Sequence, residues 1–272
     1  MNGRGFEMRK IAIFNQKGGV GKTLTTINLA GCYSKAGKKV LVVDCDAQAN
    51  TTTAFTSVSG REPEYTLVEC IKDGRNVKGA ILPVYGSVRG RETRLNIDLF
   101  PISEEIDFLT VEKPTILKDL LKEVEDDYDY VLFDCAPQRT DIMTLALCAA
   151  EYVVVPAFPE IDSVSGYGMV MTMVNYLKQN MLNNTIEILG IVINNITMRN
   201  SLEKYMYEEI CGNYGDTIFK SVIRRSTIIM QSKYFGTPIC YFRPTNPATK
   251  DYVSLASEID KRIEIREKRV GK

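Results

Sequence analysis

The chain has 272 residues, 44% of them hydrophobic, which is enough for one large α/β domain. Lys plus Arg and Asp plus Glu number 34 each, so the overall charge gives no general attraction to polyanions, and only a local patch can provide one. The absence of histidine excludes histidine-based triads. The seven cysteines include no Cys-x-x-Cys pair, so a zinc or iron–sulfur site is not expected. The sequence has no 18-residue apolar run and no signal-peptide pattern, which predicts a cytoplasmic protein.

The N-terminal region combines a short strand, a glycine-rich loop and a helix. The apolar run "RKIAIF" (9–14) predicts the strand, and "TLTTINLAGCYSKAG" (23–37) predicts a helix that ends at Gly37. Between them, "QKGGVGKT" fits a phosphate-binding loop, although Gln16 occupies the position of its first glycine. Backbone N–H groups of such a loop converge on phosphate oxygens, and the helix N-terminus favours the anion. The predicted nucleotide-binding residues are Lys17, Gly18, Gly19, Val20, Gly21, Lys22, Thr23 and Leu24.

Strands and helices then alternate along the rest of the chain. Further strands are predicted at 38–44, 95–101, 129–134, 151–157, 186–195 and 217–223, and further helices at 115–128, 140–150, 165–181, 201–215 and 248–269. Residues 57–94 are predicted to form an irregular surface excursion, and residues 1–8 a flexible end. Alternation with continuously apolar strands predicts a doubly wound, mostly parallel sheet with helices on both faces, in a single domain over 1–272.

Three carboxylates follow predicted strands. Asp44 and Asp46 end "VLVVDCD", and Asp134 ends "YVLFD". Acids at strand ends often only form turns. A pair directly after a strand next to a phosphate loop favours a catalytic role instead, because ligands bind at the carboxyl ends of parallel strands. We therefore predict a Mg²⁺ site made by Thr23, Asp44 and Asp134, and an acid that orients the attacking water.

A basic stretch runs from Thr217 to Lys250. It contains no Asp or Glu and six cations, which are Lys220, Arg224, Arg225, Lys233, Arg243 and Lys250. Such a stretch suits sequence-independent contacts with DNA phosphates, to which Arg199 adds. The alternative interpretation is an ordinary solvated basic face.

Four motifs occur in the order of a known family. "KGGVGKT", "VLVVDCDAQAN", "YVLFDCAP" and "FGTPICYFRPTNPATKDYVSLASEI" resemble the ParA/Soj partition ATPases of the deviant Walker A group, from about Arg9 to Ile263. The short segment before Arg9 is similar to that of the small type without an N-terminal helix-turn-helix domain. The resemblance implies a P-loop ATPase fold and ATP and Mg²⁺ as cofactors.

The resemblance assigns roles to the site residues. It implies that Lys17 reaches the phosphates bound by the partner subunit of an ATP-dependent homodimer, and that Lys22 holds the β- and γ-phosphates. It implies that Asp46 orients water, so that the predicted catalytic residues are Lys17, Lys22 and Asp46. The chain departs from the family at Leu24, where Thr or Ser is usual, and at Gln138 and Arg139 after "DCAP".

The resemblance also implies a function. The ATP-bound dimer is expected to bind double-stranded DNA non-specifically on the nucleoid, and a ParB-like centromere-binding protein to stimulate hydrolysis and release. The expected DNA contacts are Arg199, Arg224, Arg225 and Lys233, while one family arginine falls on Ile228.

Three alternatives come from the same superfamily. A MinD-like membrane-associated ATPase is disfavoured because the mixed-charge tail has no wide apolar face, and no membrane partner is expected. A tyrosine kinase is disfavoured because the tail lacks a tyrosine cluster. An iron–sulfur reductase is disfavoured because Cys135 has no second cysteine at a suitable spacing.

Overall fold

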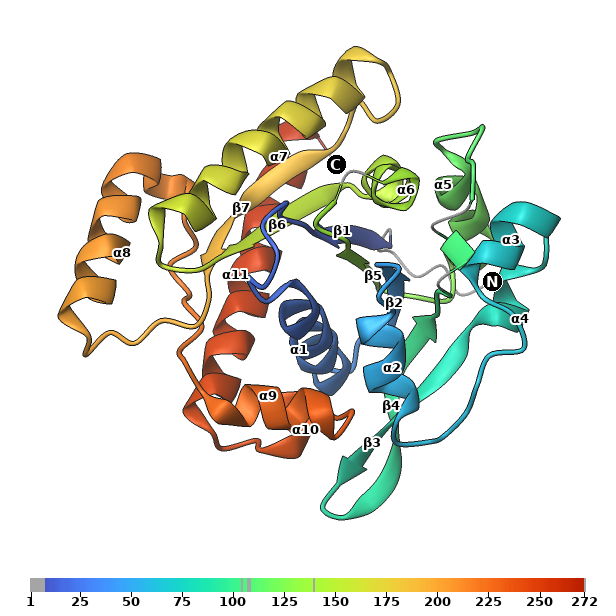
Figure 1. Ribbon diagram of the computed structural model, residues 1–272, viewed down its shortest axis with the longest axis horizontal. Helices are drawn as coiled ribbons and strands as arrows, with labels where there is room; N and C mark the ends of the chain where they lie inside the picture. The colour runs from blue at the N-terminus through green and yellow to red at the C-terminus, as the bar shows by residue number, and fades with distance from the viewer. Residues whose placement is uncertain (1–7, 104, 107–108, 139, 272) are drawn as a thin grey trace.

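The computed structural model describes residues 8–103, 105–106, 109–138 and 140–271. A seven-stranded sheet in the order β3-β4-β2-β5-β1-β6-β7 forms its centre, and every neighbouring pair except β3 and β4 is parallel (Figure 1). This architecture confirms the predicted doubly wound sheet. The strands are β1 (Arg9–Ile13), β2 (Val40–Cys45), β3 (Leu82–Val88), β4 (Arg91–Phe100), β5 (Tyr130–Cys135), β6 (Tyr152–Ala157) and β7 (Glu187–Ile193).

Helices cover both faces of the sheet. The longer ones are α1 (Lys22–Lys35), α6 (Asp141–Ala149), α7 (Ile161–Gln179), α8 (Ser201–Tyr214), α9 (Thr227–Tyr234) and α11 (Pro247–Val270). The shorter ones are α2 (Asn50–Thr56), α3 (Leu67–Asp73), α4 (Val77–Ala80), α5 (Ile116–Leu120), α10 (Ile239–Phe242) and the 3₁₀ turns η2 (Leu121–Val124) and η3 (Gly215–Thr217).

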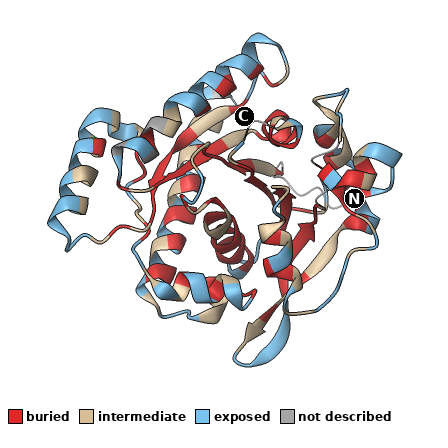
Figure 2. Cartoon of the chain, viewed as in Figure 1, coloured by how far each residue is buried: buried red, intermediate tan, exposed pale blue. Residues whose placement is uncertain are grey.

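Alternate residues of the central strands enter two separate cores. In β5, Val131 and Phe133 pack on the side of α6 and α7, whereas Tyr130 and Leu132 pack on the side of α1 and α11. Figure 2 shows the central strands buried between these two layers. A strand that is buried on both faces must be apolar throughout, which explains why the runs at 38–44 and 129–134 were visible in the sequence.

The parallel register brings the predicted site residues to one edge. Asp44 of β2 is the direct neighbour of Asp134 of β5, and Asp134 also pairs with Ile13 of β1. The glycine-rich loop follows Ile13 immediately. Residues that are about 30 to 120 positions apart in the chain therefore meet where three strands end.

The region 57–94 is more regular than predicted. It contains α3, α4, β3 and the first residues of β4, and β3 and β4 form an antiparallel hairpin at the edge of the sheet. Pro83 and Gly86 weaken the strand pattern of β3, and Pro83 is tolerated there because β3 is an edge strand. The sequence pattern therefore did not predict strand β3.

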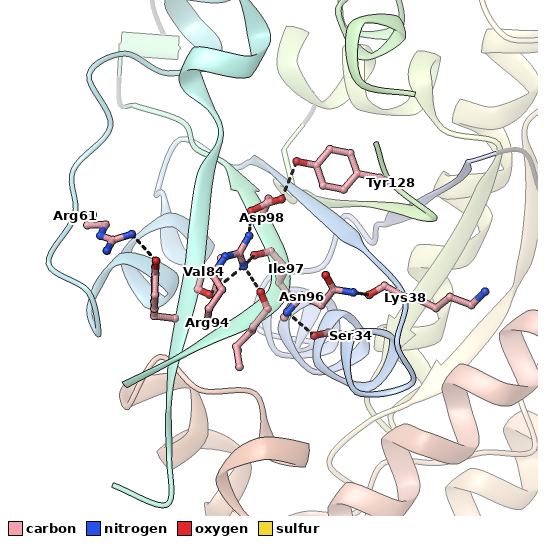
Figure 3. A network of polar contacts seen from close by, with 11 residues as sticks. Ser34, Lys38, Arg61, Val84, Arg94, Asn96, Ile97, Asp98 and Tyr128 are labelled. Carbon is pink, nitrogen blue, oxygen red and sulfur yellow. Dashed lines mark hydrogen bonds and ion pairs between the residues drawn. The ribbon is translucent and has the colours of Figure 1, made fainter. Parts of the chain in front are cut away.

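Side-chain contacts of this hairpin tie it to the rest of the molecule (Figure 3). The guanidinium of Arg94 pairs with Asp98 of the same strand and donates to backbone carbonyls, and the Tyr128 hydroxyl donates to Asp98 over 2.9 Å. Arg61 donates to the Tyr85 hydroxyl over 2.8 Å. These bonds hold the chain between α2 and β4 against the sheet edge.

The segment 217–223 is not a strand of the sheet. It lies beside β7 and makes isolated bridges, with the N–H of Phe219 bonded to the carbonyl of Ile191. The ladder is interrupted because the N–H groups of Lys220 and Ser221 donate to the carboxylate of Glu258 instead, over 2.9 and 2.8 Å.

Two other predicted elements differ in their bounds. The helix predicted at 115–128 is shorter and consists of α5 followed by η2, which ends at Val124. Of the residues predicted to be flexible at 1–8, only Met8 is described, and it is buried. None of the helices in the described part of the chain has the length and hydropathy needed to span a membrane.

Candidate nucleotide-binding site

The glycine-rich loop leaves its backbone open on one side. Gly19 and Gly21 have φ angles of 76° and 90°, which only glycine adopts readily. A Cβ atom placed on Gly18 or Gly19 meets no atom within 4 Å, whereas one on Gly21 comes within 2.9 Å of the Asn194 amide nitrogen. The loop thus has an unobstructed side that suits phosphate oxygens, and it leads into the N-terminus of α1 at Lys22.

Lys22 presents a buried ammonium to this loop. Only 7% of the residue is exposed, and its Nζ donates to the backbone carbonyl of Lys17 over 3.1 Å. Burial lowers the pKa of Lys22, although the nearby Asp134 opposes this shift. Among the described residues, no carboxylate lies within ion-pair distance of this ammonium, so its charge is free to pair with an anion on the loop.

Asp44 and Asp134 form a buried pair of acids behind the loop. The hydroxyls of Thr23 and Thr51 donate to Oδ2 of Asp134 over 2.8 and 2.6 Å. The N–H and the hydroxyl of Thr52 both donate to Oδ2 of Asp44 over 2.8 Å. Burial, followed by the charge of Asp134, raises the pKa of Asp44 to about 7, and burial also raises the pKa of Asp134.

These oxygens fit a hard divalent cation. Two carboxylates and one hydroxyl are the donors that Mg²⁺ prefers, and the cation would offset the mutual repulsion of the buried pair. The structure therefore brings together the three residues predicted for the metal, Thr23, Asp44 and Asp134.

Asp46 lies just beyond the end of β2 and is only partly buried. Its N–H donates to Oδ1 of Asp44 over 3.2 Å, and its own Oδ1 accepts from the N–H of Gln48 over 3.1 Å. These bonds hold the backbone of Asp46 close to Asp44 and Asp134, while its carboxylate remains accessible to water.

Lys17 is directed away from its own loop. Its Nζ pairs with Oε2 of Glu160, the residue before α7, at a distance of 3.2 Å, and both side chains are at the surface. The sequence analysis did not single out Glu160. An acid three residues after the strand 151–157 was the available signal, similar to the one that identified Asp46.

A cavity of about 260 Å³ adjoins the loop. It is lined by Gly19, Gly21, Leu24, Phe158, Asn194, Asn195, Ile223, Arg224, Ser226, Ile229, Met230 and Tyr252. The amide nitrogen of Asn194 donates to the Val20 carbonyl and to the Thr25 hydroxyl over 3.0 and 3.1 Å, but its buried Oδ1 has no hydrogen-bond partner among the residues that the structure describes. A mostly apolar cavity with one unpaired acceptor next to a phosphate loop suits a nucleobase with an amino donor.

The lining of this cavity explains why leucine is accepted at position 24, where the family usually has Thr or Ser. It also includes two residues that the sequence did not single out, Asn194 and Asn195. Leu24, in the first turn of α1, packs against the core on this side of the sheet and forms part of the cavity wall. Asn194 and Asn195 end the strand run "IVINN", and polar residues at that strand end were the signal for them.

Three of the four cations predicted to contact DNA have a side-chain partner in the structure. Arg224 makes two hydrogen bonds to Asp251, over 2.6 and 2.8 Å, and Arg225 pairs with Glu203 at 3.0 Å. Lys233 donates to the side chain of Asn50 over 3.1 Å, while Arg199 is exposed before α8. Gln138 is exposed, and Arg139 lies outside the described residues.

Known proteins resemble the chain over nearly its whole length. A family model described as an AAA domain matches residues 8–188. The chromosome-partitioning ATPase Soj of Thermus thermophilus is 32% identical over 95% of this chain and 98% of its own length.

Two solved structures share the fold. A putative plasmid partition protein of Borrelia burgdorferi bound to AMPPNP has a TM-score of 0.75 at 23% identity, covering 95% of this chain and 99% of that chain. The septum site-determining protein MinD of Pyrococcus horikoshii complexed with Mg-ADP has a TM-score of 0.72 at 23% identity, covering 95% and 98%. The motifs, the fold and the relative of 32% identity agree, and the chain belongs to the ParA/Soj family of partition ATPases.

Proposed function

We propose that this chain is a Mg²⁺-dependent ATPase that pairs into a dimer on binding ATP, binds DNA in that form and releases it after hydrolysis. The observation that carries the proposal is the buried ammonium of Lys22, which has a backbone carbonyl as its neighbour and no carboxylate within ion-pair distance in the described part of the chain. A buried charge without a counter-ion is costly, and a triphosphate on the open glycine loop would supply the missing negative charge.

The residues around the loop divide the remaining tasks. Thr23, Asp44 and Asp134 would hold Mg²⁺, which neutralises charge on the phosphates when bound. Asp46 has an accessible carboxylate beside this group and would orient the water that attacks the γ-phosphate. The cavity next to Gly19 and Gly21 would take the base.

Lys17 would act on the second subunit. Its ammonium lies at the surface in a solvent-exposed ion pair, so it is available for a phosphate presented by another copy of the chain. An ammonium that neutralises triphosphate charge across an interface makes assembly depend on ATP.

The proposal for the cargo rests on the relatives. The Thermus protein is named as a chromosome-partitioning ATPase, and DNA with a ParB-like centromere-binding protein is the corresponding cargo and partner here. Association with the nucleoid would follow from DNA binding. The sequence assigns Arg199, Arg224, Arg225 and Lys233 to the DNA contacts, of which Arg224 and Arg225 would first have to leave their carboxylate partners.

One pair of measurements tests this function. The protein is mixed with random-sequence duplex DNA and with ATP, ADP or no nucleotide, and its mass and its DNA mobility shift are measured in parallel. We expect a dimer and a DNA mobility shift with ATP, and neither with ADP nor without nucleotide. A monomer that binds DNA equally well in all three conditions would contradict the proposed switch.

A further inference from the structure

A groove of about 840 Å³ runs along the exposed side of α11, between this helix and the segment that follows η3. It is lined by Asp216, Lys220, Ser221, Val253, Ser254, Ser257, Glu258, Lys261, Arg262, Ile265, Arg266 and Arg269. Five of these side chains are cationic and two are acidic. The groove therefore has a positive charge in a chain whose overall charge is zero.

Two of the five cations build the wall of the groove. Arg262 donates to the carbonyls of Leu189 and Ile218 over 2.8 and 2.7 Å, and Arg266 donates to the carbonyl of Ile188 over 2.8 Å. Their charges are partly balanced by Glu258 and Glu187. These arginines attach α11 to the edge strand β7 and are not available to a ligand.

The other three cations are not engaged in this way. Lys220, Lys261 and Arg269 are exposed, and none of them has a carboxylate within 4.0 Å among the described residues. The acid Glu258 is already occupied by Arg262 and by the N–H groups of Lys220 and Ser221. The groove thus presents three ammonium or guanidinium groups together with one exposed acid, Asp216.

From these observations we propose that the α11 groove is a contact surface for the phosphate backbone of duplex DNA. This inference rests on the proposed function, because it takes DNA as the ligand, and it adds a surface on α11 to which the basic stretch 217–250 contributes only one cation, Lys220. Ser254 and Ser257 add hydroxyl donors beside the three cations, and hydroxyls and cations are the groups that bind phosphate oxygens.

The dimensions of the groove suit a duplex. From Ser254 to Arg269 the helix advances about 22 Å at about 1.5 Å per residue. At about 3.4 Å between phosphates along the axis of one strand, this length covers about six base pairs. The groove makes no demand on base identity, since nothing in it is positioned to read one.

The C-terminal half of the groove lies away from the nucleotide edge. The C-terminal part of α11 contacts the first residues of strands, since Arg266 pairs with Glu187 of β7 and Glu267 with Arg9 of β1. The glycine-rich loop and Asp134 lie at the opposite ends of the strands. Two copies that met through their nucleotide edges would leave both grooves open, and ATP would then double the number of phosphate contacts.

The test removes two of the three cations, Lys261 and Arg269, from the groove and keeps the rest of the surface. The double variant Lys261→Gln/Arg269→Gln is compared with Lys178→Gln/Lys268→Gln, which changes two exposed cations outside both the groove and the basic stretch and alters the net charge equally. Binding of random-sequence duplex DNA with ATP is measured as a function of salt. We expect the groove variant to bind at least about 10-fold more weakly at 0.1–0.2 M salt and the slope of log K against log salt to fall by about 3.6 for four lost contacts per dimer, at about 0.9 per contact.

The possible results distinguish a failure of the proposed function from a failure of the proposed DNA contact in the groove. ATPase activity without DNA and the melting temperature should be unchanged in both variants, which verifies folding. If the wild-type protein does not bind duplex DNA at all, the proposed function fails. If the wild type binds and both double variants bind as tightly, or lose the same amount, the groove is not the contact surface, and an acidic protein segment becomes the occupant to examine.

Discussion

The ammonium of Lys17 lies 3.2 Å from the carboxylate of Glu160, while the backbone carbonyl of Lys17 accepts the ammonium of Lys22 at 3.1 Å. The two lysines of the loop thus have separate partners, one at the surface and one inside. A solvent-exposed ion pair contributes only about 0–1 kcal/mol, so Lys17 can leave Glu160 for a phosphate at little cost. The buried Lys22 stays where phosphate is expected.

The first prediction separates the roles of these two lysines. We expect Lys17→Ala to bind ATP as a monomer with an affinity within about 3-fold of the wild type, and to lose ATP-dependent dimerisation, because Lys17 does not face its own phosphate loop. Titration with a fluorescent ATP analogue and light scattering measure the two properties. Glu160→Gln is the control, and it should dimerise at an equal or lower ATP concentration. Dimerisation of Lys17→Ala at the wild-type ATP concentration would exclude a role in trans.

The second prediction concerns Lys22. We expect Lys22→Ala to weaken ATP binding by at least about 100-fold, equivalent to about 2.7 kcal/mol, since a triphosphate loses a buried charge-assisted partner. The melting temperature without nucleotide should not fall, because the variant also removes a buried ammonium that has no carboxylate partner within ion-pair distance in the described structure. A variant that still binds ATP tightly would show that the loop is not the site.

The third prediction concerns the acid pair. The pKa of Asp44 is raised by burial and by Asp134 to about 7, so its ionisation is unfavourable in the folded protein. A carboxyl with a raised folded-state pKa makes the folded state bind its proton more tightly, and stability is therefore lost as pH rises from about 4 to about 7. We expect nucleotide-free protein to melt at a lower temperature at pH 7.5 than at pH 5.5.

Asp44→Asn tests the assignment of this effect. The amide keeps an acceptor for Thr52 and carries no charge, so the variant should melt at a higher temperature than the wild type at pH 7.5 without Mg²⁺. It should also lose most of the stabilisation that Mg²⁺ with ATP gives the wild type. Equal stabilisation of both proteins by Mg²⁺ would show that Asp44 does not hold the metal.

Several features of the site could be predicted because they leave a local pattern. The strands that carry Asp44 and Asp134 are buried on both faces, so their sequences are continuously apolar and the acids that end them stand out. The loop requires glycine at Gly19 and Gly21, since their φ angles are positive. Strand order along the chain then placed these groups at one sheet edge.

Other features depend on contacts between distant residues and left no such pattern. The ladder of segment 217–223 is interrupted by Glu258, which is almost 40 residues later in the chain. Arg224 and Arg225 were read as part of an acid-free stretch, but their acids come from outside it, from Asp251 and Glu203. A stretch without acids in the sequence can therefore carry little unpaired positive charge at the surface, because acids from other segments pair with its arginines.

The last prediction concerns Asp46, which lies next to the buried acids Asp44 and Asp134. Its N–H is bonded to Asp44, while its carboxylate is only partly buried and contacts the backbone of Gln48. The carboxylate makes no bond to Lys22 or to the glycine loop in the described structure, so its removal should leave ATP binding within about 3-fold of the wild type. We expect Asp46→Ala to form the ATP-bound dimer and to lose at least about 99% of its hydrolysis, because orientation of water is the task that we propose for the carboxylate.

The same variant separates this role from a purely structural one. A dimer that persists for hours with ATP and returns to monomer when ATP is exchanged for ADP supports a function in hydrolysis alone. Asp46→Asn keeps an acceptor for the Gln48 N–H but is a much weaker base, and it should behave like Asp46→Ala. If Asp46→Asn hydrolyses ATP at the wild-type rate while Asp46→Ala does not, the side chain serves to shape the loop, and the water must be oriented by another group.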